Sequence, residues 1–60
     1  MSKNHAIIEI AGEVRLEREK SYLFFDGARE AWVPKAICEW DEKDKTMQMP
    51  EWLALEKGLI

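Results

Sequence analysis

Carboxylates crowd residues 39–44, and no other part of the sequence is better equipped for binding chemistry. Four of these six residues are acidic, and Trp40 lies among them. An aromatic side chain ringed by carboxylates is typical of an interface in which an apolar anchor lies inside a polar rim. The pattern therefore favours attachment to a basic partner surface. Two plainer interpretations stay open: the segment is a solvated charged loop, and Trp40 caps one end of the core.

The net charge of the chain lies entirely in its last third. The protein has 60 residues, 12 acidic and 9 basic, and a net charge of −3. Residues 39–60 hold six of the acids and three of the bases, which leaves the first 38 residues balanced. So acidic a chain is not expected to bind nucleic acid directly, because phosphate contacts need clustered lysine and arginine. The candidate partner-binding residues are Glu39, Trp40, Asp41, Glu42, Asp44 and Glu51.

Equipment for catalysis or metal binding is sparse. His5 is the only histidine, Cys38 is the only cysteine, and the three glycines lie far apart. We therefore expect no enzyme activity, no cofactor and no metal site. Cys38 follows two apolar residues and is expected to be a small buried side chain. A single cysteine fits a reducing cytoplasm, and the apolar runs are too short to cross a membrane.

Alternation of apolar and polar residues predicts the strands that position these groups. The first strand starts at residue 6, and Gly12 within it marks a bulge or strong twist. Its apolar face consists of Ala6, Ile8, Ile10, Val14 and Leu16. Glu9, Glu13 and Glu17 lie on the opposite face, and whether they add to partner binding stays open.

Later segments extend the sheet. Residues 21–25 and 30–33 read as strands joined by a hairpin at Asp26-Gly27, and Pro34 marks an edge or an interruption. Residues 36–38 continue the strand or form a helical turn, and residues 39–45 read as a charged loop. Residues 46–49 are short enough for a last strand.

A helix is expected after the last strand. Pro50 suits its first position, and Gly58 is a candidate for its C-terminal cap. Trp52, Leu55 and Leu59 share one face by their spacing. We expect Trp52 and Leu55 to pack on the apolar face of the first strand, and Trp32 to lie in the core as well.

These elements predict one domain over residues 1–60, in which residues 1–5 form a loose N-terminal arm. The fold class is α+β: a three- or four-stranded antiparallel β-meander with one short C-terminal α-helix. A chain of this size buries only about 60% of its unfolded surface, so its core is thin.

Three strings of residues carry a likeness beyond these patterns. They are Phe-Phe-Asp-Gly at residues 24–27, Glu-Ala-Trp-Val-Pro-Lys at residues 30–35, and the segment at residues 49–60. In this order they resemble a group of small phage and prophage proteins, and the likeness covers residues 6–60. In its small size, acidity and single domain the chain also resembles the type I-C anti-CRISPR proteins.

The resemblance implies a function as an anti-CRISPR inhibitor that binds a Cascade-like (type I) surveillance complex in the bacterial host cytoplasm. It would block target DNA binding by occupying a basic surface of a nucleic-acid-binding subunit, as an acidic DNA mimic. The residues assigned to that role come from charge alone. The alternative is a non-enzymatic phage accessory module for protein–protein interaction in replication or recombination. No membrane is expected as a partner, and a monomer is favoured over a dimer.

Overall fold

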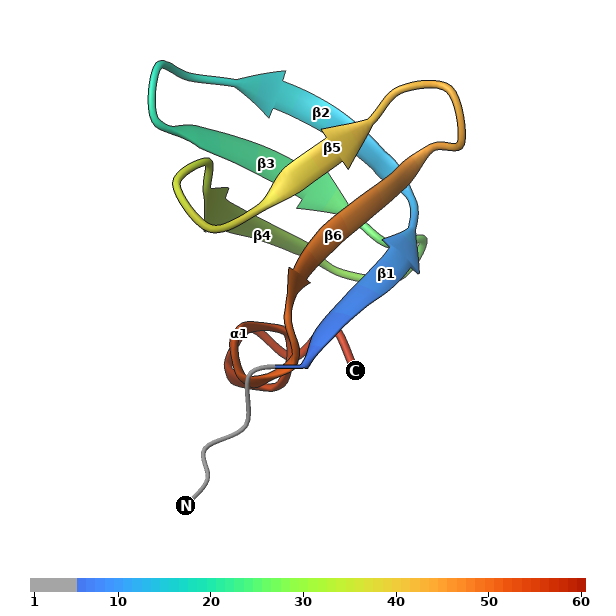
Figure 1. Ribbon diagram of the computed structural model, residues 1–60. Coiled ribbons are helices and arrows are strands. Elements are labelled where there is room, and N and C mark those ends of the chain that lie inside the picture. Colours follow the sequence, from blue (N-terminus) through green and yellow to red (C-terminus); the bar gives the residue numbers. More distant parts are fainter. Residues whose placement is uncertain (1–5) are drawn as a thin grey trace.

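The computed structural model describes residues 6–60, so the predicted arm at residues 1–5, with His5, lies outside the described part. Within residues 6–60, six antiparallel strands form two three-stranded sheets, and a short helix follows the last strand (Figure 1). Sheet A has the order β1 (Ile7–Ala11), β6 (Thr46–Pro50), β5 (Glu39–Asp41).

Sheet B is a meander of β2 (Glu13–Glu17), β3 (Ser21–Phe25) and β4 (Glu30–Pro34). The helix α1 (Glu51–Glu56) follows β6 without a linker. The predicted α+β class, with antiparallel strands and one C-terminal helix, is therefore confirmed. The number of strands exceeds the three or four expected, for two reasons that the sequence pattern concealed.

The first reason is a corner at Gly12. The predicted single strand from residue 6 divides there, and its halves join different sheets. A Cβ atom on Gly12 would lie 2.3 Å from the carbonyl oxygen of Phe25 and 2.7 Å from Cζ of Phe24. The Gly12 amide also donates to the carbonyl oxygen of Lys45 at 3.0 Å. Only a residue without a side chain lets the chain bend this closely around the core.

The second reason lies in the charged segment. Residues 39–45 were expected to be a loop, but Glu39–Asp41 pairs with β6 as β5 and only residues 42–45 form the turn. Alternation in a three-residue strand is too short to be recognised, and its charged residues are poor strand formers. Of residues 36–38, left open between strand and helical turn, Ala36 and Ile37 form a turn together with Lys35, and Cys38 lies between this turn and β5.

The core lies between the two sheets and under the helix. Phe24 and Val33 of sheet B and Met47 and Met49 of sheet A have no exposed surface. Cys38, Leu53, Ala54 and Leu59 complete the buried cluster. Large side chains from both sheets thus share one apolar layer, and Cys38 is the small buried residue that the sequence predicts.

A bulge in β2 overturns the prediction for Leu16. The register of β2 on β3 shifts between Val14 and Leu16, so Val14 pairs with Phe24 and Leu16 pairs with Leu23. One extra residue in a strand moves every later side chain to the other face. Leu16, expected in the core, is therefore 55% exposed on the outer face of sheet B.

The helix packs by a different face from the one predicted. Leu53 and Ala54 are buried, whereas Trp52 and Leu55 are 49% and 59% exposed. Pro50 is the N-cap of α1, whereas the prediction placed it at the first helical position. The prediction of a core position was also wrong for Trp32, which is 36% exposed.

The end of α1 agrees with the prediction. Gly58 has a φ of 75°, and its amide donates to the carbonyl oxygen of Leu55 at 3.2 Å. The amide of Leu59 donates to the carbonyl oxygen of Ala54 at 2.8 Å, which completes a Schellman cap. The cap turns the chain back and brings Leu59 into the core. A helix of six residues is anchored in this way at its C-terminal end.

The hairpin between β3 and β4 also forms as expected. Gly27 has a φ of 104°. The Asp26 carboxylate accepts hydrogen bonds from the amides of Ala28 and Arg29 at 2.8 and 2.7 Å. These bonds, that of Arg29 first, hold the pKa of Asp26 below its ordinary value. Hydrogen bonds between the residues of the turn itself therefore stabilise its conformation.

We expect Phe24→Ala and Trp52→Ala to separate the core from the helix surface. Phe24→Ala should lower the free energy of unfolding by about 3–5 kcal/mol, because it empties the centre of the core. Trp52→Ala should cost about 1 kcal/mol or less, because the side chain is half in water. Thermal unfolding followed by circular dichroism measures both. Equal losses in the two variants would contradict this assignment of the core.

Alanine at Gly12 and at Gly27 should have unequal effects. At Gly27 the added Cβ meets no atom within 4 Å, so only the positive φ is strained, at about 1–3 kcal/mol. At Gly12 it collides with a backbone oxygen that cannot move aside without breaking the β2–β3 pairing. Urea titrations should therefore rank Gly12→Ala well below Gly27→Ala in stability. If Gly27→Ala were the less stable variant, the corner at Gly12 would not require a glycine.

Candidate functional site

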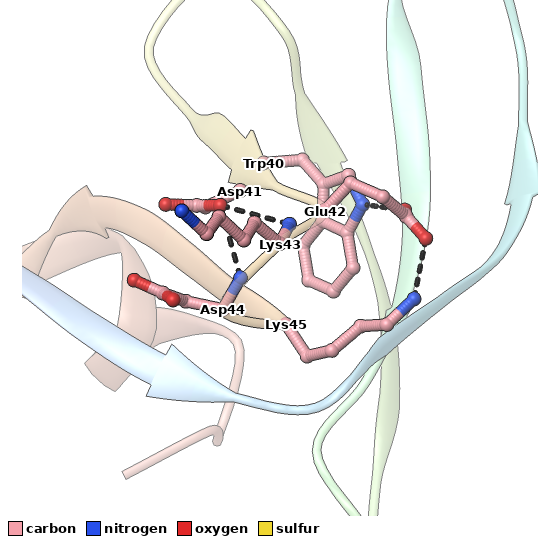
Figure 2. A network of polar contacts seen from close by, with 6 residues as sticks. All are labelled: Trp40, Asp41, Glu42, Lys43, Asp44 and Lys45. Carbon is pink, nitrogen blue, oxygen red and sulfur yellow. Dashed lines mark hydrogen bonds and ion pairs between the residues drawn. The ribbon is translucent and has the colours of Figure 1, made fainter.

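Asp41 closes the hairpin that carries the predicted acidic residues. Its carboxylate accepts hydrogen bonds from the amides of Lys43 and Asp44 at 3.0 and 3.1 Å (Figure 2). Its carbonyl oxygen accepts from the amide of Lys45 at 2.7 Å, and Lys45 has a φ of 57°. The segment is therefore an ordered turn between β5 and β6.

Trp40 points inward from β5. Its ring packs against Phe24 edge to face, with centroids 6.1 Å apart and planes at 61°. Its indole Nε1 donates to the Glu42 carboxylate at 2.7 Å. The structure thus places Trp40 at the end of the core, the plainer of the two interpretations for this residue. Because Trp40 points inward, its neighbours Glu39 and Asp41 point outward from sheet A.

Glu42 is separated from the other acids of the segment. Its carboxylate also accepts from the Lys45 ammonium, and this bond, followed by the one from Trp40, lowers the pKa of Glu42. Figure 2 shows the carboxylate of Glu42 on one side of the turn and those of Asp41 and Asp44 on the other. Glu42 therefore orients Trp40 and lies apart from the surface that Asp41 and Asp44 share.

Glu9 of β1 joins this surface, although it was not among the assigned site residues. Across sheet A, Glu9 pairs with Gln48 and Gln48 pairs with Glu39, so all three lie on one face. Gln48 Nε2 donates to the Glu9 carboxylate at 3.0 Å. Alternation alone places Glu9 on the solvent side. Its neighbours depend on a pairing between distant segments that no local pattern reveals.

We call Glu9, Glu39, Asp41 and Asp44 the acidic face. Within residues 6–60, none of these carboxylates forms an ion pair. The other glutamates of the strands differ from them. Arg15 Nε lies 3.3 Å from Glu13 and 3.5 Å from Glu30, and Lys35 Nζ lies 2.6 Å from Glu17. Two internal cations thus pair with the three glutamates of sheet B, whereas residues 6–60 provide no ion-pair partner for the acidic face.

Glu51 lies apart from the turn at residues 42–45. It is the first residue of α1, beyond the end of β6 that lies farthest from the turn at residues 42–45 (Figure 1). Five residues of strand span about 17 Å. The sequence analysis placed Glu51 at the edge of the acidic patch. In the structure, β6 separates Glu51 from the turn at residues 42–45.

A shallow depression of about 340 Å³ borders the acidic face. Ile7, Ala36, Ile37 and Cys38 contribute its apolar lining, and Lys35, Glu39 and Gln48 contribute its polar lining. Ile7 and Ile37 are largely exposed, so the depression offers apolar surface beside the Glu39 carboxylate, while the Lys35 ammonium is paired with Glu17. Burial raises the pKa of the Cys38 thiol from 9.0 to about 11, which keeps it protonated and unreactive.

No protein-family model matches the chain, and no curated protein or solved structure matches it either. Among residues 6–60, no three histidine, cysteine, aspartate or glutamate side chains gather closely enough to hold a metal ion. The same residues contain no helix long and apolar enough to cross a membrane.

The Cys38 thiol should react slowly in the folded protein. A pKa two units above the ordinary value leaves about a hundredfold less thiolate at pH 8. Alkylation by iodoacetamide, followed by mass spectrometry, should therefore be slow in buffer and fast in urea. Cys38→Ala serves as the background control. Equal rates in the two solvents would show that the thiol is open to solvent.

Proposed function

We propose that this protein is a non-enzymatic inhibitor that binds a basic, nucleic-acid-binding surface and keeps DNA from it. The proposed target is a Cascade-like (type I) surveillance complex in the bacterial cytoplasm, as the resemblance to type I-C anti-CRISPR proteins implies. The acidic face takes the place of DNA phosphates on that surface. The observation that supports this most directly is the set of carboxylates for which residues 6–60 provide no ion-pair partner.

The spacing of the carboxylates suits a partner that presents several cations. Glu39 and Asp41 are two residues apart on β5, which is about 7 Å, and Glu9 lies two strands away from Glu39, at about 10 Å. A partner that pairs with all of them must hold lysine or arginine at comparable intervals. Surfaces that follow the phosphates of DNA carry such rows of cations.

The depression beside the acidic face adds an apolar contribution. Lysine and arginine side chains carry long apolar stems, which lie along apolar surfaces while the charged ends reach carboxylates. Ile7 and Ile37 offer such a surface next to Glu39. Affinity would then rest on charge and on apolar contact together, with charge steering the encounter.

Two variants with the same loss of charge test the acidic face. The test variant combines Glu9→Gln, Glu39→Gln and Asp44→Asn; Asp41 stays because it closes the turn. The control combines Glu13→Gln, Glu19→Gln and Glu56→Gln, so both lose three negative charges, and Arg15 keeps Glu30 as its partner. Both should fold like the original protein, because exposed charges contribute little to stability.

Binding to a purified type I-C Cascade complex, measured by biolayer interferometry at several salt concentrations, gives the readout. The test variant should bind at least about tenfold more weakly than the control and depend less on salt. Target duplex DNA should compete with the original protein for the complex. Equal affinities of the two variants would contradict a role for the acidic face. Binding without competition by DNA would favour an accessory protein-interaction module instead.

A further inference from the structure

β1 lies at the margin of sheet A, and no strand of residues 6–60 pairs with its outer edge (Figure 1). A hydrogen bond from the Gly12 amide to the carbonyl oxygen of Lys45 closes one end of its ladder with β6. Hydrogen-bonded pairs alternate along an antiparallel ladder, so the even-numbered residues of β1 direct their backbone groups toward β6. The amides and carbonyls of Ile7, Glu9 and Ala11 therefore point to the open edge.

The other edges of the two sheets carry features that hinder the addition of a strand. Within residues 6–60, β5 has only three residues, and β2 is interrupted by its bulge. β4 ends at Pro34, which offers no amide to a further strand. β1 instead has five residues that pair with β6 without a register shift. Short strands, bulges and prolines are common protections of sheet edges, so β1 is the edge left able to accept another strand.

The core is incompletely covered along the same edge. Met47 and Met49 of β6 have no exposed surface, whereas Ile10 and Ile8, which pair with them, are only partly buried. All four side chains pack in or against the core on the inner face of sheet A, so the difference comes from the marginal position of β1. An added strand with apolar inward side chains would cover both isoleucines and remove apolar area from water.

The side chain of Glu9 favours a basic residue in the added strand. It is exposed on the acidic face and accepts a hydrogen bond from Gln48, but no cation of residues 6–60 pairs with it. The residue that an antiparallel strand places opposite Glu9 lies on the same face, with Cβ atoms about 5 Å apart. A lysine or arginine there forms an ion pair, whereas an acidic residue is repelled. A second copy of β1 would bring another acidic face beside the first, which its charge opposes.

We propose that β1 binds an extended segment of a partner protein, in which apolar residues alternate with lysine or arginine, as a fourth strand of sheet A. The apolar residues cover Ile8 and Ile10, and the basic residues lie on the acidic face beside Glu9. The backbone groups at the open edge supply the hydrogen bonds of the attachment. The added strand is antiparallel, as are the other strand pairs of residues 6–60, because such pairing is the more stable. The inference rests on the proposed function for the charge of the partner and adds the conformation of the segment that binds.

Amide hydrogen exchange followed by NMR, with a synthetic peptide as the probe, tests the added strand. The peptide is Lys-Val-Lys-Val-Lys-Val-Lys with blocked ends, and the control peptide has the same residues in the order Lys-Lys-Val-Val-Val-Lys-Lys. In the free protein, the amides of Ile7, Glu9 and Ala11 should exchange fast and those of Ile8 and Ile10 slowly. The alternating peptide at about 1 mM, enough for a weak complex, should slow the three fast amides at least about tenfold. The control peptide should leave them unchanged.

Methylation of peptide amides tests the backbone contacts. In the proposed pairing the lysine amides of the peptide point toward β1 and the valine amides point away from it. Methylation of the two inner lysine amides should therefore abolish the protection, whereas methylation of two valine amides should preserve it. Equal protection by the alternating and control peptides, no protection by either, or the opposite effect of the two methylations would each overturn the proposal.

A charge reversal tests the preference for basic residues. Glu9→Lys should lose the protection by the lysine peptide and gain it with Glu-Val-Glu-Val-Glu-Val-Glu. Glu19→Lys makes the same change of charge in the turn between β2 and β3 and should behave like the original protein. Circular dichroism checks that both variants are folded. Protection of the original protein by the glutamate peptide, or protection in the free protein that grows with its own concentration, would overturn the proposal; the latter would assign the edge to a second copy.

The outcomes separate this inference from the proposed function. Unprotected amides, together with a loss of Cascade binding in the acidic-face variant, would overturn the added strand and leave the proposed function standing. Protected amides in a protein that does not bind Cascade would support the added strand and contradict the proposed target.

Discussion

The close approach of Gly12 to Phe24 and Phe25 is the constraint on which the rest of the structure depends. At this point the chain leaves sheet A and enters sheet B, and the phenyl ring of Phe24 occupies the space where a side chain would stand. One amphipathic segment thereby contributes to both sheets, and each sheet presents its apolar side to a shared core. Without the corner, β1 and β2 would continue as one strand and the layer between the sheets would lie open.

The elements that depend on neighbours in sequence were predictable. The hairpin at Gly27 and the cap at Gly58 each follow from residues within a few positions of the turn itself. The predictions that were wrong concern residues whose burial depends on contacts with distant parts of the chain. A single extra residue in β2 places Leu16 on the opposite face of the sheet, and α1 packs so that Leu53, rather than Trp52, lies in the core. Side-chain size indicated that these residues needed burial but not which of them obtained it.

The candidate site shows the same division between local and distant information. Glu39, Asp41 and Asp44 were recognisable because they are acidic and lie close together in the sequence around Trp40. Glu9 required knowledge that β1 pairs with β6, and Glu42 required knowledge of the bond from the indole. Within the described part of the chain, the two open faces consequently differ in kind: one carries carboxylates that form no ion pair, and the other combines apolar side chains with glutamates that pair with Arg15.

The pairing of β1 with β6 also fixes the order in which the protein can be completed during synthesis. Sheet B and its hairpins join segments that follow one another, so they can form as soon as residue 34 is available. β1, although made before sheet B, lacks its partner strand until residue 50 appears, and Leu59 closes the core only nine residues later. Contacts between such distant segments form slowly. The nascent chain therefore exposes β1 until β6 has left the ribosome, and the core closes only after Leu59 has followed.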